Sequence, residues 1–290
     1  MNFIDLHTDM PLKLLRSEEP VSNILKGGFE GFAQNAAFWF EGNEKAPILK
    51  YNEYLNKTKK YSAKQKAEII SQSGVKNNGY LLSVENAWFL ADRLDFVYRL
   101  KRDKCFAISL TWNNDNRLAG GAFGSGTLTE KGKDVVKKIN LLNIALDISH
   151  LNESSANEAA ELAKYPIATH SNCKAVFDTE RNLSDTVLQK IRDKSGLVGI
   201  CFYPEFLGDG DVFLNIYKNI EHLLNLGMEK NIAIGSDFDG CKTDERLSNY
   251  KDIYFLYEFL LNFGIKEEVL KGIFYKNAIA FFDRMCQNKV

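Results

Sequence analysis

Short runs of apolar residues alternate along the chain with longer stretches in which apolar residues recur every three or four positions. Most of the runs are about four to eight residues long, apolar on both faces and often β-branched, which is typical of strands buried on both sides in a parallel sheet. Each run tends to end in a polar or charged residue. The predicted strands are Phe3–Leu6, Ala33–Phe40, Tyr80–Val84, Cys105–Leu110, Ile144–Ile148, Pro166–Ala168, Leu197–Phe202 and Ile232–Gly235.

The longer stretches predict helices between these strands. Asn152 precedes one stretch as a candidate cap, and another opens with Ser184-Asp185, a good helix N-terminus. The predicted helices span residues 133–140, 154–163, 184–194, 212–226, 250–263 and 266–285. Strands interleaved with helices indicate βαβ units, and their number favours a closed (β/α)8 barrel, the TIM barrel, over an open sheet. No linker or change of charge marks a boundary, so residues 1–290 are expected to form a single barrel domain.

Composition and charge exclude several classes of protein. The chain has 290 residues, of which 45% are hydrophobic and 26% charged, so it is not a disordered, collagen-like or disulfide-scaffold chain. Its 37 lysines and arginines nearly balance 38 aspartates and glutamates. A chain this close to neutral has no bulk electrostatic reason to bind nucleic acid or an acidic membrane.

The cysteines and the apolar runs bear on location. The five cysteines are odd in number and never closely spaced, which indicates free thiols in a reducing compartment. We find no signal-peptide pattern at the N-terminus and no apolar run of about 18 residues. We therefore expect a cytoplasmic protein that binds neither a membrane nor nucleic acid.

Three of the four histidines, His7, His150 and His170, directly follow predicted strands. In a parallel barrel the carboxyl ends of all strands lie at one rim, where active sites are built. Three imidazoles at one rim predict a metal site.

Carboxylates occupy equivalent positions. In His7-Thr8-Asp9 the first and third residues share a face of an extended backbone, and Zn²⁺ accepts such mixed nitrogen and oxygen ligands. Glu85 and Asp237 end two further strands, where a charge is costly unless it is paired or bound to a metal. The alternative for any one of them is a salt-bridged or solvent-exposed strand end.

Sequence motifs in a fixed order cover almost the whole chain. They are Asp5-Leu6-His7-Thr8-Asp9, Ser83-Val84-Glu85, Ser109-Leu110-Thr111, Leu128-Thr129-Glu130-Lys131-Gly132, Asp147-Ile148-Ser149-His150, Thr169-His170-Ser171-Asn172, Arg181-Asn182-Leu183, Gly235-Ser236-Asp237-Phe238-Asp239-Gly240 and Tyr275-Lys276-Asn277-Ala278. Together these motifs resemble the membrane dipeptidase (renal dipeptidase) family, peptidase family M19, of the amidohydrolase superfamily.

The resemblance implies a (β/α)8 barrel that holds two zinc ions. By this resemblance His7 and Asp9 hold one ion, His150 and His170 hold the other, and Glu85 bridges both. Two metals a few ångströms apart can lower the pKa of a shared water to about 7 and polarise the scissile carbonyl.

The resemblance also implies the remaining roles. Asp237 is the acid and base that handles the proton of the attacking water, and Arg181 receives the C-terminal carboxylate of the substrate. Tyr203 is a candidate for the pocket lining. Trp112 stands after Leu110-Thr111, where many family members have a histidine that contacts the substrate carbonyl.

With Trp112 in place of that histidine, the developing oxyanion lacks a cationic donor. Nearby candidates to donate instead are Asn113, Asn114 and Asn116. We therefore expect a zinc-dependent dipeptidase, with tolerance for a D-residue on the C-terminal side implied by the family. The alternatives are an amidohydrolase acting on another small amide, such as an N-acyl or N-formyl amino acid, and an inactive barrel that binds small carboxylated ligands. The expected partner is a dipeptide, and family members often pair as homodimers.

Overall fold

The computed structural model describes residues 1–23, 26–42, 44–71 and 78–287. Eight parallel strands follow one another around a ring, which closes where β9 pairs with β1 and β2 pairs with β4. The fold is a (β/α)8 TIM barrel, as the sequence predicts. The ring consists of β1 (Phe3–Thr8), β2 (Phe32–Trp39), β4 (Gly79–Glu85), β5 (Cys105–Ser109), β6 (Ala145–Asp147), β7 (Pro166–Ala168), β8 (Leu197–Ile200) and β9 (Ile232–Ile234).

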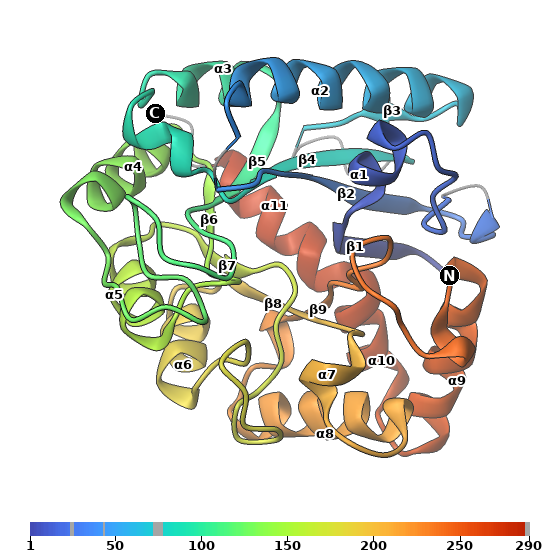
Figure 1. Ribbon diagram of the computed structural model, residues 1–290. Coiled ribbons are helices and arrows are strands. Elements are labelled where there is room, and N and C mark those ends of the chain that lie inside the picture. The colour runs from blue at the N-terminus through green and yellow to red at the C-terminus, as the bar shows by residue number, and fades with distance from the viewer. Residues whose placement is uncertain (24–25, 43, 72–77, 288–290) are drawn as a thin grey trace.

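Helices surround the ring and return the chain from one strand to the next (Figure 1). They are α1 (Met10–Leu15), α2 (Pro47–Lys64), α3 (Phe96–Arg102), α4 (Glu130–Leu141), α5 (Glu153–Leu162), α6 (Asp185–Asp193), α7 (Pro204–Leu207), α8 (Val212–Asn225), α9 (Ile253–Asn262), α10 (Glu267–Lys271) and α11 (Asn277–Gln287). A short strand, β3 (Glu68–Ile69), pairs with the first two residues of β4. Short 3-10 helices are Trp88–Ala91, Glu229–Asn231, Glu245–Leu247 and Tyr250–Asp252, and a π-helix, Gly272–Lys276, joins α10 to α11.

Side-chain caps begin several of the helices. The Asn152 side chain accepts a hydrogen bond from the Ser155 amide, and Ser184 accepts one from Val187. Such caps contribute about 1 kcal/mol each, and both confirm helix starts expected from the sequence. The predicted helix over residues 266–285 is present as one helical run from Glu267 to Gln287, in which a π-helical segment joins α10 to α11.

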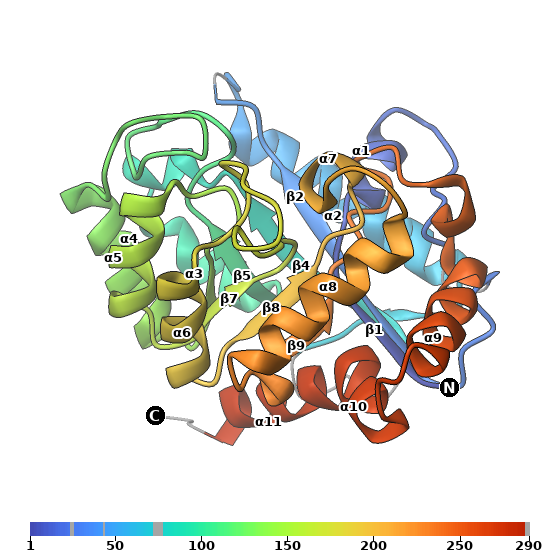
Figure 2. The ribbon, with the colours of Figure 1, turned by 90° about the horizontal axis from the view of Figure 1, so that it is seen from below.

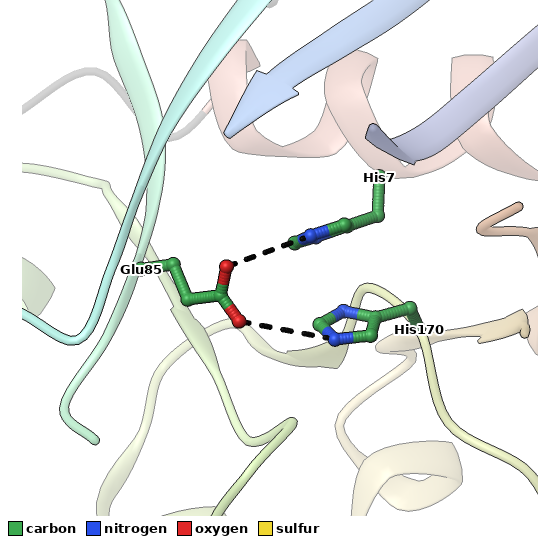
Figure 3. A group of neighbouring side chains, drawn as sticks. All are labelled: His7, Glu85 and His170. Carbon is green, nitrogen blue, oxygen red and sulfur yellow. Dashed lines mark ion pairs between the residues drawn. The ribbon is translucent and has the colours of Figure 1, made fainter. Parts of the chain in front are cut away.

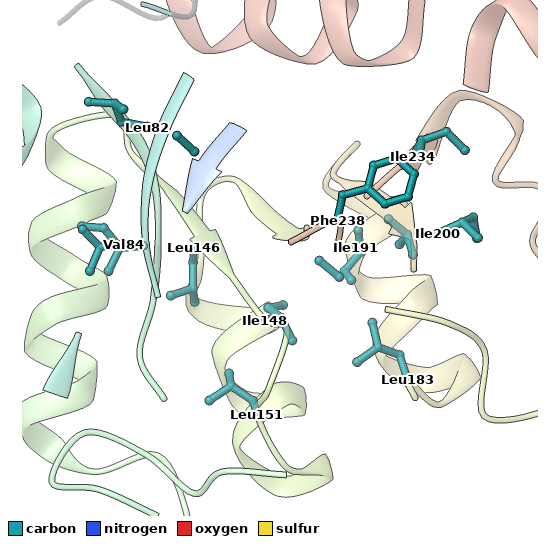
Figure 4. Close-up of a cluster of buried hydrophobic side chains, with 14 of the residues drawn as sticks. Leu82, Val84, Leu146, Ile148, Leu151, Leu183, Ile191, Ile200, Ile234 and Phe238 are labelled. Carbon is teal, nitrogen blue, oxygen red and sulfur yellow. The ribbon is translucent and has the colours of Figure 1, made fainter. Parts of the chain in front are cut away.

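The apolar core has two parts. The larger one lies between the strands and the surrounding helices, and Figure 4 shows Val84, Leu146, Ile200 and Ile234 among its members. Fully burying such a side chain contributes roughly 1.5–3 kcal/mol. Strands that bury both faces carry apolar runs instead of an alternating pattern, which explains why the runs predicted strand positions within a few residues.

The second part of the core lies against α11, which crosses the middle of the ring in Figure 1. Phe282 packs edge-on against Phe106 of β5, with ring centroids 5.4 Å apart. Phe281 packs against Tyr165, the residue before β7, at 6.3 Å. Helix α11 therefore covers the amino ends of the strands and leaves their carboxyl ends open.

Among the described residues, no helix is both long enough and apolar enough to cross a membrane.

Candidate metal centre and substrate cavity

The carboxyl ends of the strands and the loops after them surround a cavity of about 950 Å³. In Figure 2 these loops lie on the opposite side of the barrel from α11. His7 lies buried beside this cavity. The other predicted site residues line it, and they are Asp9, Glu85, Trp112, His150, His170, Arg181, Tyr203 and Asp237.

His7 and Asp9 reach the site from the end of β1. The register of β1 against β2 shifts between Asp5 and Thr8, and Asp9 is already the N-cap of α1. The two side chains still converge, with His7 Nε2 3.8 Å from Asp9 Oδ2. Their convergence comes from an irregular strand end that re-aims the side chains, and not from the uninterrupted extended backbone that the sequence suggested.

Gly240 allows the chain after β9 to pass close to two carboxylates. A Cβ atom at residue 240 would collide with Asp9 Oδ2 and lie 2.6 Å from Asp237 Oδ1. A larger residue here would require the two carboxylates to shift. The same contact places Asp9 and Asp237 side by side.

Glu85, the last residue of β4, lies between the three histidines. Its Oε1 is 2.7 Å from His150 Nε2 and 3.9 Å from His170 Nε2. Its Oε2 is 3.7 Å from His7 Nε2. Figure 3 shows the Glu85 carboxylate directed between His7 and His170. One carboxylate thus lies within 4 Å of imidazoles from three parts of the chain.

The backbone is unusual at two site residues. His150 has φ 71° and Asp237 has φ 62°, in the left-handed region that costs non-glycine residues roughly 1–3 kcal/mol. The His150 carbonyl accepts hydrogen bonds from the Thr111 hydroxyl at 3.0 Å and the Ala122 amide at 2.9 Å. The Asp237 amide donates to the His7 carbonyl at 3.1 Å. These bonds hold two strained residues in place at the cavity.

Hydrogen bonds engage the far side of each imidazole. Thr169 Oγ1 is 3.0 Å from His7 Nδ1 and 2.9 Å from His170 Nδ1. Asn113 Oδ1 is 2.8 Å from His150 Nδ1. In all three rings the Nε2 atom therefore remains to face the Glu85 carboxylate.

Burial shifts the titration of the carboxylates. Burial raises the pKa of Glu85 well above its usual value, and the charges of Asp9 and Asp237 add to the rise. Burial likewise raises the pKa of Asp237 to about 7, with a further contribution from Asp9. Three acidic groups in one buried cluster favour a bound cation.

The histidines divide into two kinds. Burial lowers the pKa of both His150 and His170 well below its usual value, so both imidazoles are neutral. For His7, burial is outweighed by Asp9 and Glu85, which raise its pKa to about 10. Neutral imidazoles are the form that binds metals.

The donor set fits divalent metal ions. His7 Nε2 is buried and has no hydrogen-bond partner among the described residues. His150 Nε2 and His170 Nε2 lie only 2.8 Å apart, where two lone pairs repel unless a proton or a cation lies between them. Two sets of ligand atoms lie within 4.8 Å of one another, His7 with Glu85 and His170, and His7 with Asp9 and Asp237. Imidazole nitrogens combined with carboxylate oxygens suit zinc.

Arg181 presents a buried cation to the same cavity. It is only 2% exposed, and its Nε and Nη2 atoms have no hydrogen-bond partner among the described residues. Its guanidinium lies 4.9 Å above the Phe206 ring. Burial lowers the pKa of Arg181, yet a guanidinium stays protonated in proteins. A buried charge with free donors is suited to bind an anion.

Aromatic side chains form other parts of the wall. Tyr203 is half-buried and packs against Phe206, with ring centroids 4.7 Å apart. Trp112 lies 5.5 Å from Trp39 and 6.1 Å from the His150 ring. Both tryptophans line the cavity.

The structure separates the three asparagines that follow Trp112. Asn113 lines the cavity and faces His150. The side-chain amide of Asn116 donates hydrogen bonds to Asn86 Oδ1 and to the Leu110 carbonyl, and these bonds hold Asn116 within the loop. Asn114 is exposed and does not line the cavity.

Sequence reasoning missed Thr169 and Asp147 as parts of the site. The Thr169 hydroxyl donates to Asp147 Oδ2 at 2.6 Å while it contacts two histidines. The available signal was their position, one residue before His170 and at the end of β6. A threonine next to a candidate metal-binding histidine is too common in sequences to be assigned a role without the distances.

Comparisons with known proteins agree with this geometry. The family model described as membrane dipeptidase (peptidase family M19) matches residues 1–289. A curated protein of Klebsiella pneumoniae, described only as uncharacterized and encoded in the region 5′ of pqqA, is 36% identical over 181 residues, which are 57% of this chain and 67% of that protein. The matches to two fission yeast proteins named as uncharacterized dipeptidases cover only 39% of their length.

Solved structures share the fold over nearly the whole chain. A dipeptidase described as a family M19 metallopeptidase has a TM-score of 0.86 and 22% identity, covering 98% of each chain. A metallopeptidase of Rhodobacter sphaeroides, solved with a phosphinate mimic of the dipeptide L-Ala-D-Ala, has a TM-score of 0.84 and 21% identity, covering 98% of this chain and 99% of that one. At such identities the likeness establishes the barrel fold.

Proposed function

The chain belongs to the membrane dipeptidase family, peptidase family M19, and from this premise we propose that it hydrolyses the peptide bond of dipeptides with the help of two zinc ions. Membership in a metallopeptidase family implies dependence on a metal. The observation that carries the proposal is that one cavity contains both a buried cluster of candidate metal ligands and the buried Arg181, whose Nε and Nη2 have no partner among the described residues. The first binds a cation and the second binds an anion.

In this proposal His7 and Asp9 would hold one zinc ion, His150 and His170 would hold the other, and Glu85 would be shared by both. The position of Glu85 within 4 Å of all three imidazoles supports its bridging role. When bound, the metal pair supplies Lewis-acid polarisation of the scissile carbonyl and lowers the pKa of the attacking water. The buried carboxylates offset the positive charge that such a pair brings.

Asp237 moves the proton. Its carboxylate lies beside Asp9 at the edge of the cluster, where it takes a proton from the attacking water and passes it to the leaving amine. In the metal-free protein, burial raises the pKa of this carboxyl to about 7.

Arg181 selects short substrates with a free C-terminus. Two nitrogens of its guanidinium have no hydrogen-bond partner in the described part of the chain, and a guanidinium binds a carboxylate in a bidentate manner. A longer peptide would place a neutral amide there and leave the buried charge unpaired. Tyr203, beside Phe206 in the same wall, contacts the C-terminal residue of the substrate. The dipeptide mimic bound by the Rhodobacter relative has a D-residue at this end, which supports tolerance of a D-residue here.

Trp112 favours a second candidate, hydrolysis of another small amide such as an N-acyl or N-formyl amino acid. A tryptophan in the cavity wall next to His150 offers apolar surface in place of a charged donor. An N-acyl group is uncharged, whereas the N-terminus of a dipeptide carries a positive charge.

Metal content and hydrolysis test the proposal together. We expect about two zinc ions per chain by elemental analysis, and release of free amino acids from dipeptides that a chelator abolishes and zinc restores. Two metals with turnover of N-acyl amino acids only would establish the second candidate. Failure to bind zinc after reconstitution would overturn the ligand assignment and the mechanism.

A further inference from the structure

Two tryptophans form a continuous apolar part of the cavity wall, the Trp39–Trp112 wall. Trp39 ends β2 and Trp112 follows β5, and their rings meet edge-on at 75° with centroids 5.5 Å apart. Trp112 remains 37% exposed although it is a large apolar side chain. The Lys50 ammonium lies 5.2 Å from the Trp39 ring centre and helps to hold that ring.

The order of strands places the Trp39 end of this wall across the cavity from Arg181. In the ring of eight, β2 and β7 are four strands apart, so their ends face each other across the barrel. Arg181 lies in the loop after β7, and its guanidinium packs on Phe206, which follows β8. The cluster around Glu85 lies between the two sides.

A dipeptide with its carboxylate on Arg181 and its scissile bond at the Glu85 cluster extends its N-terminal residue towards β2 and β5. We propose that the Trp39–Trp112 wall is the subsite for the N-terminal side chain, and that the preferred substrates carry a large apolar or aromatic residue there. The inference rests on the proposed function. Indole rings bury apolar side chains and pack edge-to-face with aromatic ones, whereas alanine or glycine would leave the wall in contact with water.

A panel of dipeptides that differ only in the N-terminal residue tests the subsite. With zinc-loaded enzyme we expect kcat/KM for Phe-Ala and Leu-Ala to exceed that for Gly-Ala by about tenfold or more. Trp39→Ala and Trp112→Ala should reduce this preference to less than about threefold while zinc content stays at the wild-type level. Trp88→Ala is the matched control, because Trp88 is the third tryptophan of the chain and does not line the cavity.

The outcomes separate the subsite from the function. If the wild-type kcat/KM for Gly-Ala equals that for Phe-Ala, the subsite is wrong and the dipeptidase proposal stands. The same conclusion follows if both variants keep the full preference. If a Trp88→Ala variant loses the preference equally, the effect is general and the subsite is wrong. Absence of any dipeptide turnover by the zinc-loaded wild type would overturn both proposals.

A separate observation concerns the hydrogen bonds beneath the metal cluster. The Thr169 hydroxyl lies 2.6 Å from Asp147 Oδ2, 2.9 Å from His170 Nδ1 and 3.0 Å from His7 Nδ1. A threonine hydroxyl has one proton and two lone pairs, and a carboxylate accepts only. The hydroxyl proton therefore goes to Asp147, and both Nδ1 atoms must donate to Thr169.

This arrangement determines where each imidazole carries its proton. With Nδ1 protonated on His7 and His170, the Nε2 atoms of both rings are left to bind a metal ion. The backbone of Thr169 is also held tightly, because its amide donates to Asp147 Oδ1 at 3.0 Å. A Cβ at Gly235 would collide with the Thr169 carbonyl oxygen, so the chain packs closely around this residue.

We infer that Thr169 is a positioning residue shared by the two zinc sites of the proposed function, because it orients one histidine of each. Thr169→Val keeps the shape and removes the hydroxyl, and it should weaken zinc binding at both sites together by about 10- to 100-fold. Thr169→Ser should restore it. Asn113→Leu should weaken only the site of His150, since Asn113 contacts that ring alone among the three.

Zinc titration against a competing chelator measures both sites, and nitrogen NMR of the zinc-loaded protein detects the Nδ1 protons of His7 and His170. Thr58→Val is the control, because Thr58 is a buried threonine of α2 whose hydroxyl has no partner among the described residues. Wild-type zinc affinity in Thr169→Val, or weakening of one site alone, would overturn the inference. A wild type that binds fewer than two zinc ions would contradict the proposed metal centre instead, before any variant is made.

Discussion

At the scale of single residues, the charged groups that line the cavity differ in burial, and the buried ones are those with proposed roles. Asp237 and Arg181 are both buried at the cavity, one beside the metal-binding cluster and one with donors free. Other charged residues of the same wall, such as Glu245 and Lys242, are exposed to solvent. This contrast provides matched controls for both proposed roles.

Asp237→Asn removes the proposed proton carrier and keeps the shape of the side chain. We expect kcat to fall by about 10²- to 10⁴-fold with zinc content unchanged, because an amide cannot accept the water proton. Glu245→Gln, in the same wall, should change kcat little. Loss of zinc in parallel with activity would make Asp237 a metal ligand, as its grouping with His7 and Asp9 permits.

Arg181→Ala removes the proposed anion site. We expect kcat/KM for dipeptides to fall by about 10- to 100-fold, the worth of a charge-assisted hydrogen bond, with zinc content unchanged. Dipeptide amides, which lack the carboxylate, should be affected much less. Lys242→Ala should leave both substrates near the wild-type rate. Equal losses on the acid and on the amide would disprove the role of Arg181.

At the scale of elements, one end of the barrel contributes to stability and the other end carries the candidate site. Helix α11 covers the amino ends of the strands, and the site lies at their carboxyl ends. The loop after β5 is held in shape by Asp115. The Asp115 carboxylate accepts hydrogen bonds from the Gly121, Ser125 and Gly126 amides. Through Ala122 the same loop also bonds the His150 carbonyl.

Phe282→Ala in α11 should destabilise the fold by about 3–5 kcal/mol, because it leaves a cavity in a core where Phe282 is only 1% exposed. Denaturant unfolding measures this change. The control Phe255→Ala, at a 65% exposed position of α9, should stay within about 0.5 kcal/mol of the wild type. Zinc content of folded Phe282→Ala should match the wild type, and a loss of zinc would contradict the separation of stability from chemistry.

At the scale of the whole molecule, the candidate metal-binding cluster joins elements far apart in the sequence. Its side chains come from β1, β4 and the segments after β6, β7 and β9. Without a cation, several buried acidic groups lie close together, and burial raises the pKa of Glu85 and Asp237. A bound metal should therefore stabilise the closed barrel as well as catalyse the reaction.

Removal of zinc should lower the unfolding temperature. Binding at free zinc one hundred times the dissociation constant stabilises the folded state by about 2.7 kcal/mol per site. For a chain of this size that corresponds to a shift of several degrees. Thermal unfolding with and without a chelator measures it, and His150→Ala should lose part of the zinc-dependent shift. An unfolding temperature that is the same with and without the chelator would contradict binding of zinc to the folded state.

The sequence by itself determined the barrel and the types of residue at its rim. Strands buried on both faces require apolar runs, and polar residues such as His7, Glu85 and His170 at the ends of those runs stand out from them. Caps such as Asn152 are local, because side chain and amide are three residues apart. Patterns of this kind are visible along a chain without knowledge of its contacts.

Only the tertiary structure decided which side chains meet. The contact of Thr169 with both His7 and His170, the burial of Arg181 over Phe206 and the meeting of Trp39 with Trp112 all join different strands or loops. Such contacts depend on how the ring closes and on the paths of the loops, which no local periodicity encodes. The chemistry of the rim could therefore be anticipated from residue types, whereas its positioning and its specificity required the distances.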